Sequence, residues 1–245
     1  MQKFLIQKQR ISNNRVWITD QDAKHISRIL RMKKGDRLDL TDGTGTDYSG
    51  IILEASPNQV ELELTNKHLS TTESPLKIRV CSGMLKHQKM DEIIKNLTQL
   101  GVYEWVPFFC ERSIPSPDVK GLKKSLNRWQ TIARESVKQC RRSRVPDILP
   151  PVEFMDLLEL TQSSGIKIAF WEGSDRSLKR LDRGTRAADS LVSILIGPEG
   201  GFSDREIEMA QAKGFTSFSL GPRILRAENA SACACALVQH ILGDM

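Results

Sequence analysis

Residues 195–202, with the sequence LIGPEGGF, decide the fold of the second half of this chain. Residues 191–196 are almost all apolar, which is typical of a strand that is covered on both faces of a sheet. The glycine pair that follows lets the main chain turn sharply and lets a ligand approach it closely. Ser203 and Glu206 have the spacing of a capping box, so we expect a helix to begin there.

A second stretch, residues 220–230 with the sequence LGPRILRAENA, also passes from an apolar run through glycine into helical sequence. A strand, a glycine turn and a helix N-terminus form a common ligand-binding arrangement in α/β proteins. One such turn alone is better explained as a simple connection between elements. The two breaks at Gly197 and Gly221 together favour one shared pocket.

The residues of the first turn argue against two classes of ligand site. The turn lacks the Gly-Lys-Ser/Thr of a P-loop, so no lysine is supplied for phosphates, and it lacks the G-x-G-x-x-G of a dinucleotide turn. Glu199 stands in the middle of the turn, where its carboxylate would repel a polyphosphate. The turn therefore favours a neutral or cationic ligand that backbone groups hold.

The composition limits the partners and the compartment of this chain of 245 residues. A net charge of +6 and an isoelectric point near 9.1 favour an anionic partner such as RNA, although a basic protein without such a partner fits the charge equally well. Five cysteines without a C-x-x-C pair indicate reduced thiols and argue against a zinc site or a disulfide framework. The sequence has no signal peptide or membrane-spanning run, so we expect a cytoplasmic protein with neither a membrane nor a metal partner.

The chain is predicted to contain two domains that differ in the order of their strands and helices. Residues 1–72 indicate a small β-rich domain, with strands over residues 16–18, 37–42, 49–55 and 60–64. After a linker rich in Ser, Thr and Pro at residues 68–75, strands and helices alternate through residues 73–245. Strands are expected there over residues 76–81, 104–109, 166–170, 191–196 and 216–220, and helices over residues 90–100, 122–140, 154–160, 204–213 and 229–242. This alternation implies an α/β domain with a mainly parallel sheet, and residues 172–189 are expected to form a polar loop.

A short helix is expected over residues 23–32 of the first domain, because Thr19 and Asp22 resemble a helix cap. Its polar side presents His25, Arg28 and Arg31. Cations at helical spacing suit RNA phosphates, which position an RNA without reading its sequence. An ordinary solvated helix face fits this segment equally well.

The GPEGGF and LGPRILRAENA stretches resemble the two C-terminal signatures of the 16S rRNA uridine-N3 methyltransferase family, an RsmE-like family within the SPOUT class of S-adenosylmethionine enzymes. The sequence HISRILR at residues 25–31 resembles the barrel signature of that family, and ESVKQCRRS at residues 135–143 resembles a stretch that lines its site region. The resemblance covers nearly the whole chain and is strongest over residues 191–230.

The resemblance implies a SPOUT-type trefoil-knotted α/β domain over residues 73–245, which carries the cofactor site and pairs into a homodimer. It also implies a PUA-like, RNA-binding β-barrel over residues 1–72. The implied activity is S-adenosylmethionine-dependent methylation of N3 of a specific uridine in the 16S rRNA of the small ribosomal subunit. Two alternatives remain open, namely a SPOUT methyltransferase for another RNA base and a catalytically silent RNA-binding homologue.

Methylation at uridine N3 requires a held methyl donor, a proton acceptor for N3 and a cation for the charge left on the O2–N3–O4 edge. By resemblance, the S-adenosyl-L-methionine site consists of Phe170, Ile196, Gly197, Gly201, Leu220, Gly221, Ile224 and Leu225, with Trp171 as a further wall. Arginine keeps its charge and presents a planar fork to carbonyl oxygens, so Arg226 and then Arg112 are the candidate cations. Glu199 is the candidate base, since Glu228 fits helix capping better. The RNA-binding candidates are His25, Arg28, Arg31, Lys86 and Arg142.

Three groups of residues depart from the pattern of the family. Arg141 stands where glycine is usual, Ala227 and Asn229 stand where threonines are usual, and the helix at residues 95–99 lacks the usual Gln-Lys…Glu pattern. These departures leave the implied fold unchanged. They raise the question of substrate choice and turnover, and they are the reason for keeping the silent RNA-binding alternative.

Overall fold

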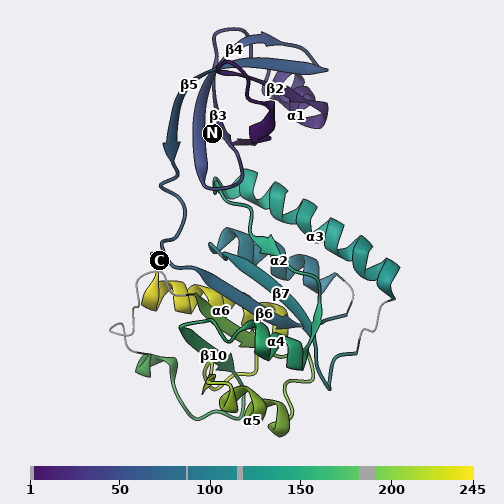
Figure 1. Cartoon of the computed structure of the whole chain (residues 1–245), viewed down its shortest axis with the longest axis vertical. Helices are drawn as coiled ribbons and strands as arrows, with labels where there is room; N and C mark the ends of the chain where they lie inside the picture. The colour runs from purple at the N-terminus through teal and green to yellow at the C-terminus, as the bar shows by residue number, and fades with distance from the viewer. Residues whose placement is uncertain (1–2, 87, 115–117, 182–190) are drawn as a thin grey trace. The chain divides into compact units, whose positions relative to one another are not determined.

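The computed structural model describes residues 3–86, 88–114, 118–181 and 191–245 (Figure 1). The chain divides into two compact units, of which the first contains Met1–Glu73 and Arg134–Val145 and the second contains Ser74–Ala133 and Pro146–Met245. The sequence analysis placed a single boundary after residue 72 and gave residues 134–145 to the second domain. The predicted loop at residues 172–189 lies outside the described residues from residue 182 onward.

The first unit is built on a five-stranded sheet with the order β1-β3-β4-β5-β2. Its strands are β1 (Phe4–Leu5), β2 (Arg15–Thr19), β3 (Arg37–Thr41), β4 (Thr46–Ala55) and β5 (Gln59–Leu69). All pairings are antiparallel except that of β1 with β3. The predicted alternation is confirmed on β3, where Leu38 and Leu40 are buried and Asp39 is exposed. β1 was missed because two residues carry no periodicity, and β5 extends into the predicted linker.

The predicted helix of the first unit is shorter than expected. α1 (Asp20–Lys24) passes into a π-helical turn, η2 (His25–Ile29), and Thr19 makes no side-chain capping bond. Arg31 has a φ of 55°, in the left-handed region, which ends the helix before residue 32. Arg31 therefore lies beyond the helical face that carries His25 and Arg28.

The second unit is built on a seven-stranded sheet, in which the strand order is β12-β10-β11-β6-β7-β8 and β9 also pairs with β7. Its strands are β6 (Ile78–Gly83), β7 (Glu104–Phe109), β8 (Asp147–Ile148), β9 (Val152–Glu153), β10 (Ile166–Phe170), β11 (Val192–Ile196) and β12 (Thr216–Phe218). Every pairing is parallel, as predicted. β11 lies between β10 and β6 and is buried along its whole length, which explains its continuous apolar sequence. The two-residue strands β8 and β9 were not predicted.

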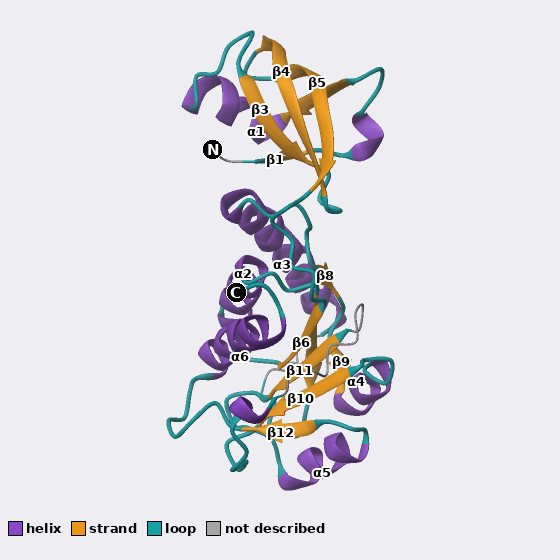
Figure 2. Cartoon of the chain, turned by 90° about the vertical axis from the view of Figure 1, so that its left-hand side faces the viewer, coloured by secondary structure: helices purple, strands orange, loops and turns teal. Residues whose placement is uncertain are grey.

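The helices of this unit are α2 (Lys89–Gln99), α3 (Val119–Cys140), α4 (Phe154–Leu160), α5 (Asp204–Ala212) and α6 (Ala227–Leu242). α2 and α6 pack against each other on one face of the sheet, and α4 and α5 lie on the other face (Figure 2). The expected capping box of α5 is present, since Ser203 and Glu206 each accept from the backbone N–H of the other. Gly101 and Gly214 follow α2 and α5 with φ of 82° and 88°, as helix-ending glycines do.

Parallel pairing brings the carboxyl ends of three strands to one edge of the sheet. Phe170 at the end of β10 is in register with Ile196 at the end of β11 and with Phe218 at the end of β12. The loops that follow these strands therefore start side by side. In open α/β sheets such an edge is the usual place for a ligand.

Candidate active site

A cavity of about 1220 Å³ lies at the carboxyl ends of β10, β11 and β12. The loop after each of these strands contributes to its wall, together with the first turns of α6 and two lysines near the start of α2. The volume exceeds the roughly 300–1,000 Å³ of ordinary small-molecule sites. The cavity is therefore large enough for a nucleoside cofactor and part of a second substrate.

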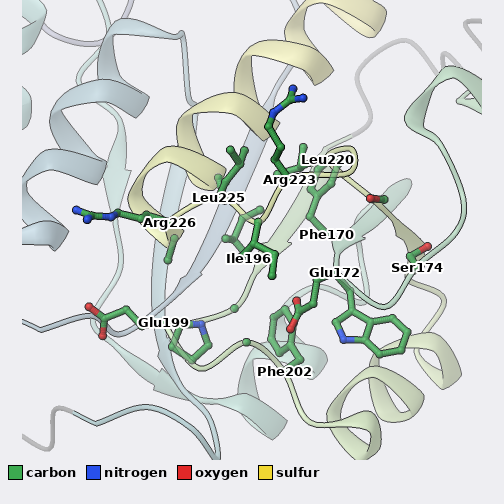
Figure 3. A pocket seen from close by; sticks show the side chains of 18 of the residues that line it. Phe170, Glu172, Ser174, Ile196, Glu199, Phe202, Leu220, Arg223, Leu225 and Arg226 are labelled. Atoms are coloured by element: carbon green, nitrogen blue, oxygen red, sulfur yellow. The ribbon is translucent and has the colours of Figure 1, made fainter.

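The two glycine turns contribute to the same cavity, as the sequence predicted. The lining includes all eight residues that were expected to contact a cofactor: Phe170, Ile196, Gly197, Gly201, Leu220, Gly221, Ile224 and Leu225. Trp171, the further wall residue, also lines it. Figure 3 shows the side chains of Phe170, Ile196, Leu220 and Leu225 gathered in the centre of the view.

The glycine turn after β11 has no room for side chains. Gly201 has a φ of 67°, and a Cβ on this residue would overlap the carboxylate of Glu172. A Cβ on Gly197 would lie 3.2 Å from the Phe202 ring. Gly83, which sequence reasoning missed, packs so closely that a Cβ would lie 2.5 Å from the Pro198 nitrogen. Of the three, Gly197 and Gly201 line the cavity, and the lack of a side chain lets a ligand approach their main chain closely.

Arg112 has a different position from the one expected of a catalytic cation. Its Nη1 donates to the carbonyl oxygens of Gly200 at 2.9 Å and Phe202 at 3.2 Å, and it does not line the cavity. The sequence analysis placed this guanidinium beside the reacting edge of the uridine. In the structure it supports the glycine turn from outside, so we no longer count Arg112 as a catalytic candidate.

Arg226 and Glu199 both line the cavity and lie on the same side of it (Figure 3). The Glu199 carboxylate accepts a hydrogen bond from Lys89 Nζ at 2.5 Å, and this bond raises the pKa of Lys89. The same ammonium lies 3.8 Å from Glu228 Oε2, an atom that has no hydrogen-bond partner among the described residues. Glu228 is only 6% exposed, so Lys89 is the cation that compensates its buried charge.

The five RNA-binding candidates do not form one group. Lys86 is exposed and lines the cavity, whereas Arg28 and Arg31 are exposed on the first unit. His25 packs edge-on against the Phe4 ring at 6.0 Å. Arg142 is only 4% exposed, and its Nε and Nη2 donate to Glu73 Oε2 at 3.1 and 2.8 Å. Because its charge is neutralised inside the first unit, we withdraw Arg142 from the RNA-binding set.

The departures from the family pattern do not close the cavity. Arg141 has a φ of 62°, which explains why glycine is usual there. Ala227 lines the cavity with a small side chain. The helix positions at residues 95–99 lie on α2 outside the cavity lining.

Two further findings concern metal sites and membrane spans in the described part of the chain. Among the described residues, no group of three His, Cys, Asp or Glu side chains is placed to hold a metal ion. None of the helices formed by these residues has the length and apolar character that crossing a membrane requires.

Comparison with known proteins gives consistent matches. The family described as RNA methyltransferase domain matches residues 72–239, and the family described as RNA methyltransferase PUA domain matches residues 18–65. Ribosomal RNA small subunit methyltransferase E of Buchnera aphidicola is 31% identical, over 95% of this chain and 93% of its own. The protein of the same name from Bacillus subtilis is 30% identical, over 98% of this chain and 96% of its own.

Solved structures match over the full length. Ribosomal RNA small subunit methyltransferase E from Neisseria gonorrhoeae, bound to S-adenosyl methionine, superposes with a TM-score of 0.88 and 27% identity, covering 100% of this chain and 99% of its own. A methyltransferase from Legionella pneumophila in complex with SAM gives a TM-score of 0.85 and 26% identity, covering 100% of this chain and 98% of its own.

Proposed function

Because the chain belongs to the RNA methyltransferase family, we propose that it is an S-adenosylmethionine-dependent methyltransferase that acts on N3 of a specific uridine in the 16S rRNA of the small ribosomal subunit. It has the SPOUT-type α/β fold with an N-terminal PUA-like domain, as the sequence predicted. The threading of the chain into a trefoil knot stays a prediction.

The observation that carries this proposal is the convergence of the two glycine turns on one cavity. The residues present fit the cofactor, since Gly197 and Gly201 line the cavity without side chains of their own. Ile196, Leu220 and Leu225 offer apolar surface for the adenine ring, a typical lining for a nucleoside site. When bound, S-adenosylmethionine supplies an electrophilic methyl group.

The polar residues on one side of the cavity suit the uridine. Arg226 is exposed at the cavity wall, where its guanidinium is free to bind one of the two oxygens that flank N3, O2 or O4, and stabilise the charge left when N3 loses its proton. Glu199 is a carboxylate that lines the cavity on this side and is the candidate proton acceptor. Lys89 holds that carboxylate in place and keeps a positive charge beside it.

The RNA is proposed to contact both units of the chain. Arg28 and Arg31 on the PUA-like domain, with His25 beside them, would bind phosphates, and Lys86 would contact the RNA at the mouth of the cavity. A homodimer and a cytoplasmic location, in keeping with action on ribosomal RNA, complete the proposal, and no metal is required for methyl transfer to a deprotonated nitrogen.

A transfer assay tests the function. Recombinant protein and labelled S-adenosylmethionine are incubated with small-subunit particles that lack the modification, and the RNA is then digested for nucleoside mass spectrometry. We expect label in N3-methyluridine. Label in another nucleoside would support the first alternative, a SPOUT methyltransferase for a different base.

A protein that binds RNA but not the cofactor would instead support the catalytically silent alternative. Calorimetry with S-adenosylmethionine separates this case from the enzyme. Failure to transfer methyl to any RNA, by a protein that is folded, would overturn the proposed activity.

A further inference from the structure

Glu172 is a carboxylate of the cavity wall that the proposed mechanism does not use. It lies two residues after the end of β10, and no hydrogen bond or ion pair engages its side chain among the described residues. Two other acids near the turns are engaged, since Glu199 pairs with Lys89 and Glu206 caps α5. Figure 3 shows the Glu172 side chain pointing from its loop toward the glycine turn beside Phe202.

The position of Glu172 is fixed by the turn that carries it. The N–H of Ser174 donates to the Trp171 carbonyl at 3.2 Å, and the N–H of Trp171 donates to the carbonyl of Phe218 on β12 at 3.0 Å. The Ser174 hydroxyl also donates to the Ser217 carbonyl at 3.1 Å. These bonds anchor both ends of the turn to the neighbouring strand, so the backbone that carries Glu172 is positioned before any ligand arrives.

The glycine turn leaves room for this carboxylate. A Cβ on Gly201 would overlap the Glu172 side chain, so the absence of a side chain there allows the acid to lie against bare main chain. The backbone N–H of Gly201 donates to the Pro198 carbonyl at 2.9 Å and is therefore not the partner of the acid. The Glu172 oxygens remain available to a ligand in the cavity.

The charged residues of the cavity wall come from several elements. Lys86, Lys89 and Arg226 come from the α2 side and from the start of α6, Glu199 pairs with Lys89, and Arg223 comes from the loop after β12. Glu172 and Asp175 come from the loop after β10. In Figure 3, Arg226 and Glu199 lie on the opposite side of the view from Glu172. The reacting uridine belongs with the cations, because N3 carries negative charge when it attacks. A methyl donor would then present its methyl group to that side, which would leave its nucleoside part for the side that carries Glu172.

Resting on the function proposed above, we infer that Glu172 binds the ribose hydroxyls of the cofactor. An ionised carboxylate has two oxygens that can each accept from one hydroxyl of a vicinal diol, and such charge-assisted hydrogen bonds are strong. An acidic residue near a strand end binds ribose in the same way in dinucleotide-binding α/β proteins. Glu172 would therefore make the pocket selective for a ribonucleoside.

Calorimetry with paired ligands tests this assignment. The ligands are S-adenosylhomocysteine and its analogue without the 2′ and 3′ hydroxyls, and the proteins are the parent, Glu172→Ala and Glu172→Gln. We expect the parent to bind the natural ligand about 20-fold more tightly than the analogue. The affinity of Glu172→Ala for the natural ligand should be about 20-fold lower than that of the parent, so that this variant binds the two ligands with equal affinity. The affinity of Glu172→Gln for the natural ligand should lie between those of the parent and of Glu172→Ala.

Asp175→Ala is the matched control, because Asp175 lies on the same loop and lines the same cavity. We expect its affinity for both ligands to stay within about threefold of the parent, which would exclude a general effect of negative charge. Glu172 is exposed and unpaired in the described structure, so thermal unfolding of its variants should match the parent.

Several results would overturn the assignment. An equal loss for both ligands would place Glu172 on another part of the cofactor, and a loss for S-adenosylmethionine but not for S-adenosylhomocysteine would place it on the sulfonium. Unchanged binding by Glu172→Ala would refute the ribose contact while the proposed function stood. A folded parent that binds neither S-adenosylmethionine nor S-adenosylhomocysteine would refute the proposed function as well.

Discussion

The loops after β11 and β12 both contain Gly-Pro, yet the structure supports them very differently. The loop after β11 is braced from outside by Arg112, which binds the carbonyls of Gly200 and Phe202, and by Gly83, which packs on Pro198. Its far end is fixed by the capping box of α5.

The loop after β12 has much less support. Gly221 donates to the hydroxyl of Ser219 within the loop, and Ser219 is tied to the Arg176 carbonyl. Beyond Gly221 the loop is open, and Ile224 is 89% exposed. Two similar motifs therefore serve different ends. We expect the first loop to act as a preformed cradle for the cofactor and the second to supply side chains to the ligand and to the substrate.

The largest expected effect is at the end of the second loop. Arg226→Ala should lower turnover by about 100- to 1,000-fold, because one charge-stabilising donor is lost at the uridine edge, and should change S-adenosylmethionine affinity only a few-fold. The measurements are single-turnover methylation and calorimetry. Arg223→Ala is the control, because Arg223 lies in the same loop and also lines the cavity. We expect this variant to lower turnover by less than tenfold. Equal losses from the two variants would mean that Arg226 has no special role.

The second test compares Gly201 and Gly221, one glycine with positive φ from each of the two loops. Gly201→Val should weaken cofactor binding by about 100-fold, since the side chain meets the Glu172 carboxylate in a left-handed backbone. At Gly221 the φ is 107°, but a Cβ would meet no atom within 4 Å. In Gly221→Val only backbone strain should act, and we expect it to weaken cofactor binding by about tenfold. Cofactor titration measures both affinities. A larger loss of affinity in Gly221→Val than in Gly201→Val would contradict the distinction between a preformed first loop and an open second loop.

The third test removes the Arg112 side chain, which supports the loop after β11. Arg112→Ala frees the carbonyls of Gly200 and Phe202 and should weaken cofactor binding by about tenfold, as the loss of hydrogen bonds to a charged group does. Turnover at saturating cofactor should stay within about threefold of the parent. If turnover fell while affinity held, Arg112 would be a catalytic residue after all.

The smallest expected effect is on stability and comes from backbone strain at Arg141, away from the ligand site. Arg141 has a φ of 62° without being glycine, and its exposed side chain lies outside the cavity. Arg141→Gly relieves a strain of about 1–2 kcal/mol but makes the unfolded chain more flexible, so we expect a net gain of up to about 1 kcal/mol. Chemical denaturation measures it. A loss of stability would show that the arginine side chain contributes more than its backbone costs.

Local patterns predicted much of the fold because they are read over a few neighbouring residues. The bounds of β7, β10 and α4 agree with the prediction, those of α2 differ by one residue at each end, and those of α5 differ by one residue at the carboxyl end. The two-residue strands were missed because they have no periodicity of their own. The π-helical turn at His25–Ile29 was also missed, since its hydrogen bonding leaves no distinct pattern in the apolar spacing.

The candidate cofactor residues were predicted from resemblance and then found around one cavity, but the charged residues were harder to place. Arg112 and Arg142 are cations that the sequence could not distinguish from Arg226. Arg112 binds carbonyls 88 and 90 residues away, and Arg142 pairs with Glu73, 69 residues away. No local pattern carries such pairings.

The sequence by itself determined the parallel α/β domain, the two glycine turns and the small β-rich unit, because each depends on hydrophobic period and on backbone freedom near each residue. The tertiary structure alone decided which charges face the cavity. Lys89 meets Glu199 across 110 residues, Arg142 is buried against Glu73, and Glu172 remains without a partner among the described residues. Ion pairing depends on distances of a few ångströms in space, and such distances are set only when the strands have taken their places in the sheet.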